Sequence, residues 1–316
     1  STSGVGVSEG TGVEVGGTTV KLGYFDLDGN VLEKWEIPTR KENGGANIIS
    51  DIAGSILVKM KQNNIDKEEV VGVGLGVPGP VTEDGTVLVA VNLGWGKFNP
   101  NNQLADILGL PVRTGNDANV AALGEMWKGG GQGHKNMVAV TLGTGVGGGI
   151  IIDGHVICGS NGAGGEIGHI HLEDEETQQC GCKGYGCLEQ YASATGIVRL
   201  ANKKLADSSK DSILRKEEIT AKSVWDAVKE KDELAMEVAE VYGKYLGKGL
   251  AAVANVVNPE IFVIGGGVSK AGKVVIDYMK PYFEKYAFPG AKNAKFSLAT
   301  LGNDAGIYGS AKLVLE

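Results

Sequence analysis

The sequence has little cysteine, no long hydrophobic run and no excess of positive charge. Four cysteines among 316 residues, with no basic and then apolar signal pattern at the start, argue against a secreted disulfide framework. No apolar run approaches the roughly 20 residues of a transmembrane helix. Lys plus Arg number 30 against 38 Asp plus Glu, a formal charge of −8, which indicates neither a nucleic-acid nor a membrane surface. These absences predict a globular cytoplasmic protein. Because its net charge is negative, any anionic ligand would have to be held by the residues of one local site.

Glycine, in contrast, is abundant. It occupies 51 of 316 positions, well above a usual share of about 7%. Most glycines gather at the ends of apolar, β-branched runs, where they let the backbone turn with positive φ or approach a ligand closely. The clusters lie at residues 16–17, 72–79, 143–149, 162–168 and 265–267.

Hydrophobic periodicity predicts alternating strands and helices. Strands are expected at 12–26 and 31–37, which form an opening hairpin, and at 70–77, 137–142, 149–152 and 261–264. Helices are expected at 46–60, 117–127, 188–205, 233–257 and 304–314. Because this order repeats, we expect two related α/β lobes with a cleft between them, at residues 1–116 and 117–303. Fold analogy predicts that the last helix, about 304–316, packs back on the first lobe.

Residues 166–189 carry a set of metal ligands. His169 is followed by Cys180, Cys182 and Cys187, which together supply the three thiolates and one imidazole of a closed tetrahedral zinc site. The two short Cys spacings let one tight loop surround the ion. A disulfide with a spare thiol is the alternative, and it fits poorly with so few cysteines. The fourth cysteine, Cys158, is expected to be buried and inert.

Glu166 and Glu189 lie just outside the two ends of this ligand set. Zinc with four protein ligands has no open position for chemistry, so the ion is predicted to be structural. Carboxylates on a rigid metal loop are suited to accept hydrogen bonds from several hydroxyl groups, as a sugar requires. For either glutamate alone, a solvated surface position would be the default interpretation.

Three glycine-rich segments are candidates for holding phosphate. Residues 16–19, 142–149 and 264–268 join strand-like runs, and backbone N–H groups in such turns form anion-binding concavities. The first two match neither the Walker sequence nor the dinucleotide spacing, and simple tight turns are the alternative. The pair Asn116-Asp117 opens a predicted helix, where Asp117 either caps the helix or projects a carboxylate into a site.

Together these segments closely resemble the ROK family of sugar kinases, and within it the glucokinase branch, over nearly the whole chain. The resemblance rests on residues 15–21, 76–81, 116–125, 141–151, 165–189 and 263–268. It implies a two-lobed α/β fold of the actin-like, ribonuclease-H-like ATPase type, with a ligand cleft between the lobes. It also implies ATP and Mg²⁺ as cofactors, and transfer of the terminal phosphoryl group to the 6-hydroxyl of glucose.

The resemblance further implies roles for individual residues. Asp117 is expected to be the general base that accepts the proton of the sugar hydroxyl. Expected sugar ligands are Gly79, Asn116, Asp117, Glu166, His169 and Glu189. His169 would contact zinc and sugar through opposite ring nitrogens. Nucleotide, phosphate and magnesium contacts are expected from Glu14, Gly17, Thr18, Thr19, Thr144, Gly145, Gly265, Gly266 and Gly267.

One position departs from the family pattern. Glu14 stands where the family has Asp, a carboxylate that helps to organise magnesium and phosphate. The extra methylene moves the carboxylate by roughly an ångström, a displacement that can cost about 10²-fold when positioning is the catalytic device. Glu14 could still act through water, because Mg²⁺ usually keeps several water ligands. Residues 1–11 are also unlike the usual lead-in.

Three other functions compete with a glucose kinase. A kinase for fructose, mannose or N-acetylmannosamine would share the zinc loop, although residues 92–95 resemble the glucokinase branch. A sugar-responsive transcription regulator would need a helix-turn-helix domain, for which we expect no room before Gly12. A catalytically silent sugar-binding protein is motivated only by Glu14. The expected partners are a small sugar, ATP and a second copy in a homodimer, with neither nucleic acid nor membrane.

Overall fold

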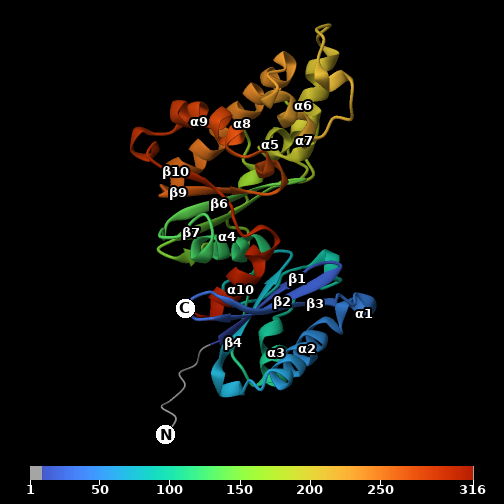
Figure 1. Ribbon diagram of the computed structural model, residues 1–316, viewed down its shortest axis with the longest axis vertical. Helices are drawn as coiled ribbons and strands as arrows, with labels where there is room; N and C mark the ends of the chain where they lie inside the picture. The colour runs from blue at the N-terminus through green and yellow to red at the C-terminus, as the bar shows by residue number, and fades with distance from the viewer. Residues whose placement is uncertain (1–8, 316) are drawn as a thin grey trace.

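Two five-stranded sheets organise residues 9–315, which the computed structural model describes (Figure 1). Most of the unusual N-terminal segment, residues 1–8, therefore lies outside the described part. The first sheet contains β1 (Glu9–Val15), β2 (Thr19–Asp26), β3 (Val31–Pro38), β4 (Val70–Val77) and β5 (Val112–Asn116). The second sheet contains β6 (Met137–Leu142), β7 (Val146–Ile152), β8 (His155–Val156), β9 (Ile261–Gly265) and β10 (Lys295–Leu298).

Both sheets have the same topology. Their strand orders are β3-β2-β1-β4-β5 and β8-β7-β6-β9-β10. In the first sheet, β1, β2 and β3 are antiparallel neighbours, whereas β4 and β5 continue parallel to β1. The second sheet repeats this arrangement, with β6, β7 and β8 antiparallel and β9 and β10 parallel to β6. The repeated order predicted from the sequence is therefore present as a repeated topology.

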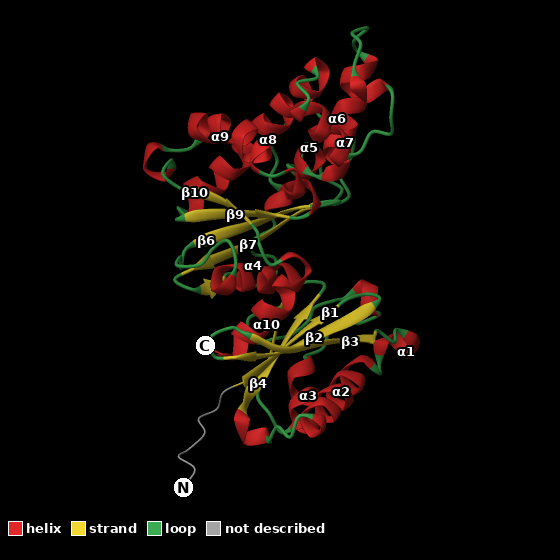
Figure 2. Ribbon diagram, in the orientation of Figure 1, coloured by secondary structure: helices red, strands yellow, loops and turns green. Residues whose placement is uncertain are grey.

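Helices form layers on both sides of each sheet (Figure 2). The outer face of the first sheet is covered by α2 (Ile48–Gln62) and α3 (Pro100–Leu108), after the short α1 (Glu42–Gly45). The outer face of the second sheet carries α5 (Glu189–Ala192), α6 (Ala194–Ala206), α7 (Ala221–Lys229), α8 (Glu233–Val257) and α9 (Lys273–Tyr286). Between the two sheets lie α4 (Asp117–Lys128) and α10 (Ala305–Leu315). Within residues 9–315, no helix has the length and apolar character needed to cross a bilayer.

The two lobes meet where α4 and α10 pack on each other. A Cβ at Gly309 would collide with the carbonyl oxygen of Val120, and one at Gly124 would collide with that of Ala305. Glycine is therefore required for this close approach of the two backbones. Although α10 follows β10 of the second sheet, it packs on β1 and β4 of the first. The boundary between the lobes at residue 116 stays a prediction.

Each sheet has its own hydrophobic core. The core between the first sheet and its outer helices includes Tyr24, Ile52 and Leu75, all at most 1% exposed. The core above the second sheet is larger and is centred on Trp225 and Tyr242, whose rings meet edge to face at 5.4 Å. The two lobes therefore have separate hydrophobic cores.

The single helix expected at 188–205 is wrong, because the segment forms α5 and α6 with a break at Ser193. Ser193 is extended, with φ −76° and ψ 168°, and its Oγ accepts a hydrogen bond from the N–H of Gly196 at 2.8 Å. Serine favours such a helix N-cap. The apolar spacing continues across the break, so periodicity alone does not reveal it.

The glycine loop expected at 142–149 is also shorter than predicted. Leu142 pairs with Val146 and Val140 pairs with Gly148, so only residues 143–145 remain as a turn. A Cβ at Gly148 would lie 2.7 Å from Cγ1 of Ile167. The later glycines of this segment thus allow the start of the zinc loop to pack on β7, rather than lengthening the turn.

Candidate active site

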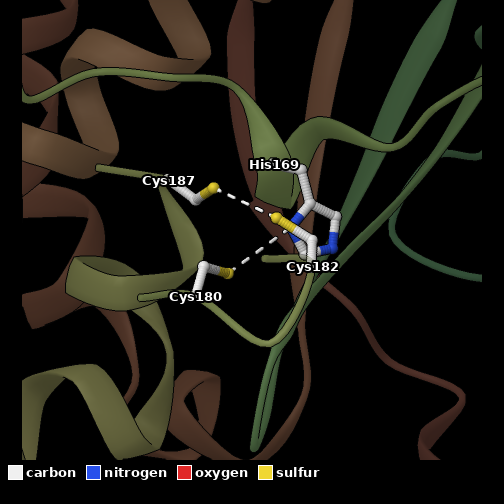
Figure 3. Close-up of side chains that lie close together, drawn as sticks. All are labelled: His169, Cys180, Cys182 and Cys187. Carbon is white, nitrogen blue, oxygen red and sulfur yellow. Dashed lines mark hydrogen bonds between the residues drawn. The ribbon is translucent and has the colours of Figure 1, made fainter. Parts of the chain in front are cut away.

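The four predicted zinc ligands converge on one point (Figure 3). The ligand atoms of His169, Cys180, Cys182 and Cys187 all lie within 4.8 Å of one another. Sγ of Cys182 is 3.5 Å from Sγ of Cys187, and Nδ1 of His169 is 3.8 Å from Sγ of Cys180. Because Nδ1 faces the sulfur atoms, Nε2 on the other side of the ring can contact a different partner. Three sulfurs and one nitrogen match the donor set of structural zinc.

All four cysteines are free thiols, so the disulfide alternative is absent. The N–H of Gly184 donates to Sγ of Cys182 at 3.4 Å and lowers the pKa of that thiol to about 7. Burial raises the pKa of Cys187 to about 12, and a bound cation would reverse this effect by stabilising the thiolate. Cys158 is half-buried, not fully buried as expected, and burial raises its pKa, which keeps it a poor nucleophile.

Glu189 connects the zinc loop to the glycine turn after β6. Its Oε1 accepts a hydrogen bond from the N–H of Val146 at 2.9 Å, and its Oε2 lies 3.9 Å from Sγ of Cys180. A Cβ at Gly145 would collide with this carboxylate, so glycine at that position makes the contact possible. The predicted sugar ligand and the predicted phosphate loop are therefore direct neighbours.

Strand β5 leads directly into α4 at Asn116 and Asp117. Oδ1 of Asn116 accepts hydrogen bonds from the N–H groups of Ala118 and Asn119, at 3.0 and 3.3 Å, which makes Asn116 the N-cap. Its Nδ2 donates to the carbonyl oxygen of Gly79 at 2.6 Å. Oδ1 of Asp117 also accepts from the N–H of Ala118, at 2.8 Å. Since Asn116 already caps the helix, Asp117 is not needed for that task.

Asp117 and Glu14 are carboxyl groups in largely desolvated positions. Burial raises the pKa of Asp117, the N–H of Ala118 partly offsets this shift, and the negative charge of Glu166 adds to it. Burial also raises the pKa of Glu14, whereas its cross-strand neighbour Lys21 lowers it and Asp117 raises it. Carboxyl groups perturbed in this way are typical of functional sites.

A hollow of about 470 Å³ opens in front of these two carboxyl groups. Glu14 and Asp117 form part of its wall, and Thr144, Gly145 and Glu189 form another part. The hollow therefore brings a predicted base, a predicted magnesium ligand and a predicted phosphate turn together, although they come from β1, α4 and the β6–β7 turn. The carboxylate of Glu14 also lies against the first turn of α10, where a side chain on residue 306 would collide with it.

A second hollow, of about 380 Å³, adjoins the first and shares Ala118, Ala121 and Thr141 with it. The predicted nucleotide residues Gly265, Gly266 and Gly267 line it. Other residues that line it were not predicted from the sequence: Glu125, Ser269, Lys270, Ala299 and Asn303. Ser269 and Lys270 directly follow the glycine-rich segment 264–268, which is a signal that could have found them. Asn303 lies too far away in the sequence to carry such a signal.

The remaining predicted residues line neither hollow. Gly17, Thr18 and Thr19 belong to the β1–β2 turn, which is closed by a 2.9 Å hydrogen bond from the N–H of Gly16 to the carbonyl oxygen of Thr19. Gly79 and Asn116 bind each other at the end of the first sheet. Glu166 lies within electrostatic range of Asp117, and His169 belongs to the thiol cluster.

Gly79 provides a test of this architecture. Its φ is +115°, and a Cβ there would collide with the carbonyl oxygen of Val89. We expect Gly79→Ala to destabilise the protein by about 1–3 kcal/mol and to weaken sugar binding, because the Asn116 contact moves with the backbone. Gly54→Ala in α2 is the control, since the added Cβ has no other atom within 4 Å apart from its chain neighbours and the backbone of its own helix. Calorimetric melting compares the two, and equal melting temperatures would contradict the expectation.

The family model, the related sequence and the related structure that match this chain agree with one another. The model of the ROK family matches residues 10–316. A glucokinase of Halalkalibacterium halodurans is 46% identical over 96% of this chain and 94% of its own. The crystal structure of a ROK family glucokinase from Streptomyces griseus, in complex with glucose and AMPPNP, is 33% identical, with a TM-score of 0.71, and the match covers 96% of this chain and 98% of that one.

A ROK hexokinase structure from Thermus thermophilus agrees, at 28% identity and a TM-score of 0.76 over 96% of each chain. These neighbours and the duplicated sheets confirm the predicted two-lobed, actin-like ATPase fold. The family match extends over both lobes and includes the zinc loop and the glycine-rich segments 16–19, 142–149 and 264–268. The chain therefore belongs to the ROK family.

Proposed function

We propose that this protein is a sugar kinase that transfers the terminal phosphoryl group of ATP to glucose, giving glucose 6-phosphate. The observation that carries the proposal is the pair of adjoining hollows, one with Asp117 opposite the Thr144 turn and one lined by Gly265–Gly267. The Halalkalibacterium glucokinase and the Streptomyces enzyme with bound glucose and AMPPNP support glucose and ATP as the substrates.

In this proposal Asp117 is the general base. Its carboxylate accepts the proton of the sugar 6-hydroxyl while that oxygen attacks the terminal phosphorus of ATP, and ADP leaves with the bridging oxygen. Phosphoryl transfer has a loose transition state, so positioning and charge neutralisation contribute most of the rate. A positioned base contributes about 10²–10⁴-fold. Its raised pKa makes Asp117 a stronger base than an ordinary aspartate.

Sugar hydroxyls would be held by residues from both lobes. We assign this role to Gly79, Asn116, Glu166, His169 and Glu189. Gly79 can contribute only backbone groups, whereas the other four supply side-chain donors or acceptors. Two of these side chains are held in place, because Asn116 donates to Gly79 and Glu189 accepts from Val146. Nε2 of His169 is directed away from the thiol cluster and can donate to, or accept from, a hydroxyl group.

The nucleotide would lie across both hollows. Thr144 and Gly145 would contact its phosphates, and Gly265, Gly266 and Gly267 its adenosine. Gly17, Thr18 and Thr19 stand on the facing lobe, so we expect closure of the cleft to bring their N–H and hydroxyl groups to the phosphates. Glu14 would hold magnesium through water, and the ion would neutralise charge on the phosphates. The buried carboxyl group of Glu14 beside Asp117 fits a cation there.

Zinc would be structural. His169, Cys180, Cys182 and Cys187 would supply all four ligands of the ion, which would leave no position for substrate. Its role would be to fix Glu166 and Glu189 at the two ends of the loop. We further propose a cytoplasmic homodimer, with lobes at residues 1–116 and 117–303, on the basis of the family resemblance.

A sugar panel tests the proposal. ADP release from magnesium ATP should be fastest with glucose when fructose, mannose, N-acetylmannosamine and N-acetylglucosamine are assayed in parallel. A preference for another hexose would keep the mechanism and change the substrate. No release with any sugar from a folded, zinc-loaded protein would contradict the kinase assignment and favour a silent sugar-binding protein. The variant Glu14→Asp would then show whether the longer side chain prevents catalysis.

A further inference from the structure

The carboxylate of Glu125 is buried at the base of the second hollow, although nothing in the proposed reaction uses it. The residue is 4% exposed and lies in the last turn of α4. A negative charge is unfavourable at the C-terminal end of a helix, and burial of a charge is costly unless hydrogen bonds compensate. The buried carboxylate of Glu125 therefore needs hydrogen-bond donors that compensate for its charge.

The donors are backbone N–H groups from two separate segments. Oε1 of Glu125 accepts hydrogen bonds from Thr300 at 3.1 Å and Leu301 at 2.9 Å. Oε2 accepts from Gly130 at 2.9 Å and from Thr300 at 3.2 Å. A Cβ at Gly129 would collide with Oε2, so glycine lets the turn after α4 fold over the carboxylate. Hydrogen bonds to an ionised acceptor are about twice as strong as neutral ones.

Thr300 and Leu301 belong to the segment 299–304, which forms part of the wall of the second hollow. Ala299, Gly302 and Asn303 line that hollow together with the glycines at 265–267. The far end of the segment is attached to the first lobe: Nζ of Lys34 lies 2.8 Å from Oδ2 of Asp304. On the second lobe, the N–H of Ala299 donates to the carbonyl oxygen of Ile264 at 2.8 Å, and Glu125 fixes the next two residues, Thr300 and Leu301, to α4.

We propose that Glu125 is a positioning residue for the nucleotide, an inference that rests on the proposed kinase function. It holds Thr300 and Leu301, and with them Gly302 and Asn303, in the wall that a purine nucleoside beside Gly265–Gly267 would contact. Glu125 itself acts through backbone N–H groups and takes no part in proton or phosphoryl transfer. Its loss should therefore weaken nucleotide binding and leave the sugar site intact.

Glu125→Gln tests the inference with little change in side-chain volume. The amide nitrogen cannot accept a hydrogen bond, so at least one N–H group loses its partner. We expect KM for ATP to rise about tenfold, the effect of losing roughly one charge-assisted hydrogen bond, while KM for glucose changes less than about twofold. The rise in melting temperature on adding AMPPNP should shrink in parallel. Glu125→Asp, which withdraws the carboxylate by one methylene, should change ATP binding in the same direction.

Glu260→Gln is a control for the same substitution at an exposed position. Glu260 also accepts backbone N–H groups, from Lys135 and Asn136 at 3.3 and 3.1 Å, but it lines neither hollow. The Glu260→Gln variant should have unchanged KM values for ATP and for glucose. An equal rise in both KM values for Glu125→Gln, or a lower melting temperature with unchanged KM for ATP, overturns the inference. Should Glu125→Gln fail to fold, Glu125→Asp decides by the same criteria.

The binding measurement separates this inference from the proposed function. If the wild-type protein phosphorylates no sugar, the proposed function fails, and the AMPPNP-induced rise in melting temperature still compares wild type with Glu125→Gln. A smaller rise in the variant supports the inference in that case. An equal rise, or no rise in the wild-type protein, overturns it.

Discussion

Replacing Asp117 with Asn should lower turnover of glucose by about 10²–10⁴-fold while sugar binding is retained. The amide has the shape of the carboxylate and can still accept the N–H of Ala118, so the start of α4 should be preserved. It cannot accept the hydroxyl proton, however, and the base is lost. Steady-state kinetics and glucose titration by calorimetry measure the two effects separately.

The pH dependence of the wild-type enzyme provides a second readout of Asp117. The base works only when it is ionised, and burial raises its pKa above the ordinary value of an aspartate. As the pH falls through this raised pKa, kcat/KM should fall, at a higher pH than an exposed aspartate with a pKa of about 3.9 would give. The small residual activity of Asp117→Asn should lack this acid limb.

Asp232→Asn is the control for the Asp117 variant. Asp232 caps α8 through a 3.0 Å hydrogen bond from the N–H of Ala235, and it lines neither hollow. Asp232→Asn therefore removes a carboxylate at a helix start without changing the cleft, and this variant should turn over glucose at the wild-type rate. Near-wild-type turnover by Asp117→Asn would remove Asp117 from the role of base.

Cys180→Ser should remove zinc from the loop and raise KM for glucose by more than about tenfold. Sγ of Cys180 lies near both His169 and Glu189, so loss of this ligand should loosen two proposed sugar contacts together. A tenfold effect corresponds to about 1.4 kcal/mol, roughly one hydrogen bond to the sugar. Metal analysis, glucose kinetics and hydrogen exchange over residues 166–189 measure the result.

Cys158→Ser is the natural control, because Cys158 is the one cysteine outside the cluster. It should keep both its zinc and its affinity for glucose. Chelation of the wild-type protein should reproduce the effect of Cys180→Ser, with the zinc loop loosening before either core unfolds. If glucose affinity is undiminished after verified zinc removal, the proposed link between the ion and the sugar site is wrong.

Local patterns predicted much of the site. The spacing of His169, Cys180, Cys182 and Cys187 was enough to predict that their side chains converge, because a short loop can bring its own residues together without help from the rest of the fold. The start of α4 at Asp117 was likewise readable from a capping asparagine before an apolar periodic run. The break at Ser193 was missed, because the apolar spacing there suits one helix as well as two.

The sequence by itself determined the α/β class, the ligand set of the zinc loop and the helix that begins with Asp117, since each depends on interactions between residues close in the chain. Only the tertiary structure decided which glycine turns line the hollows, and that Glu125 meets Thr300, 175 positions away. It also decided that α10 lies between the two sheets. Such contacts depend on how two cores pack against each other, a sum of many small terms that no single segment encodes.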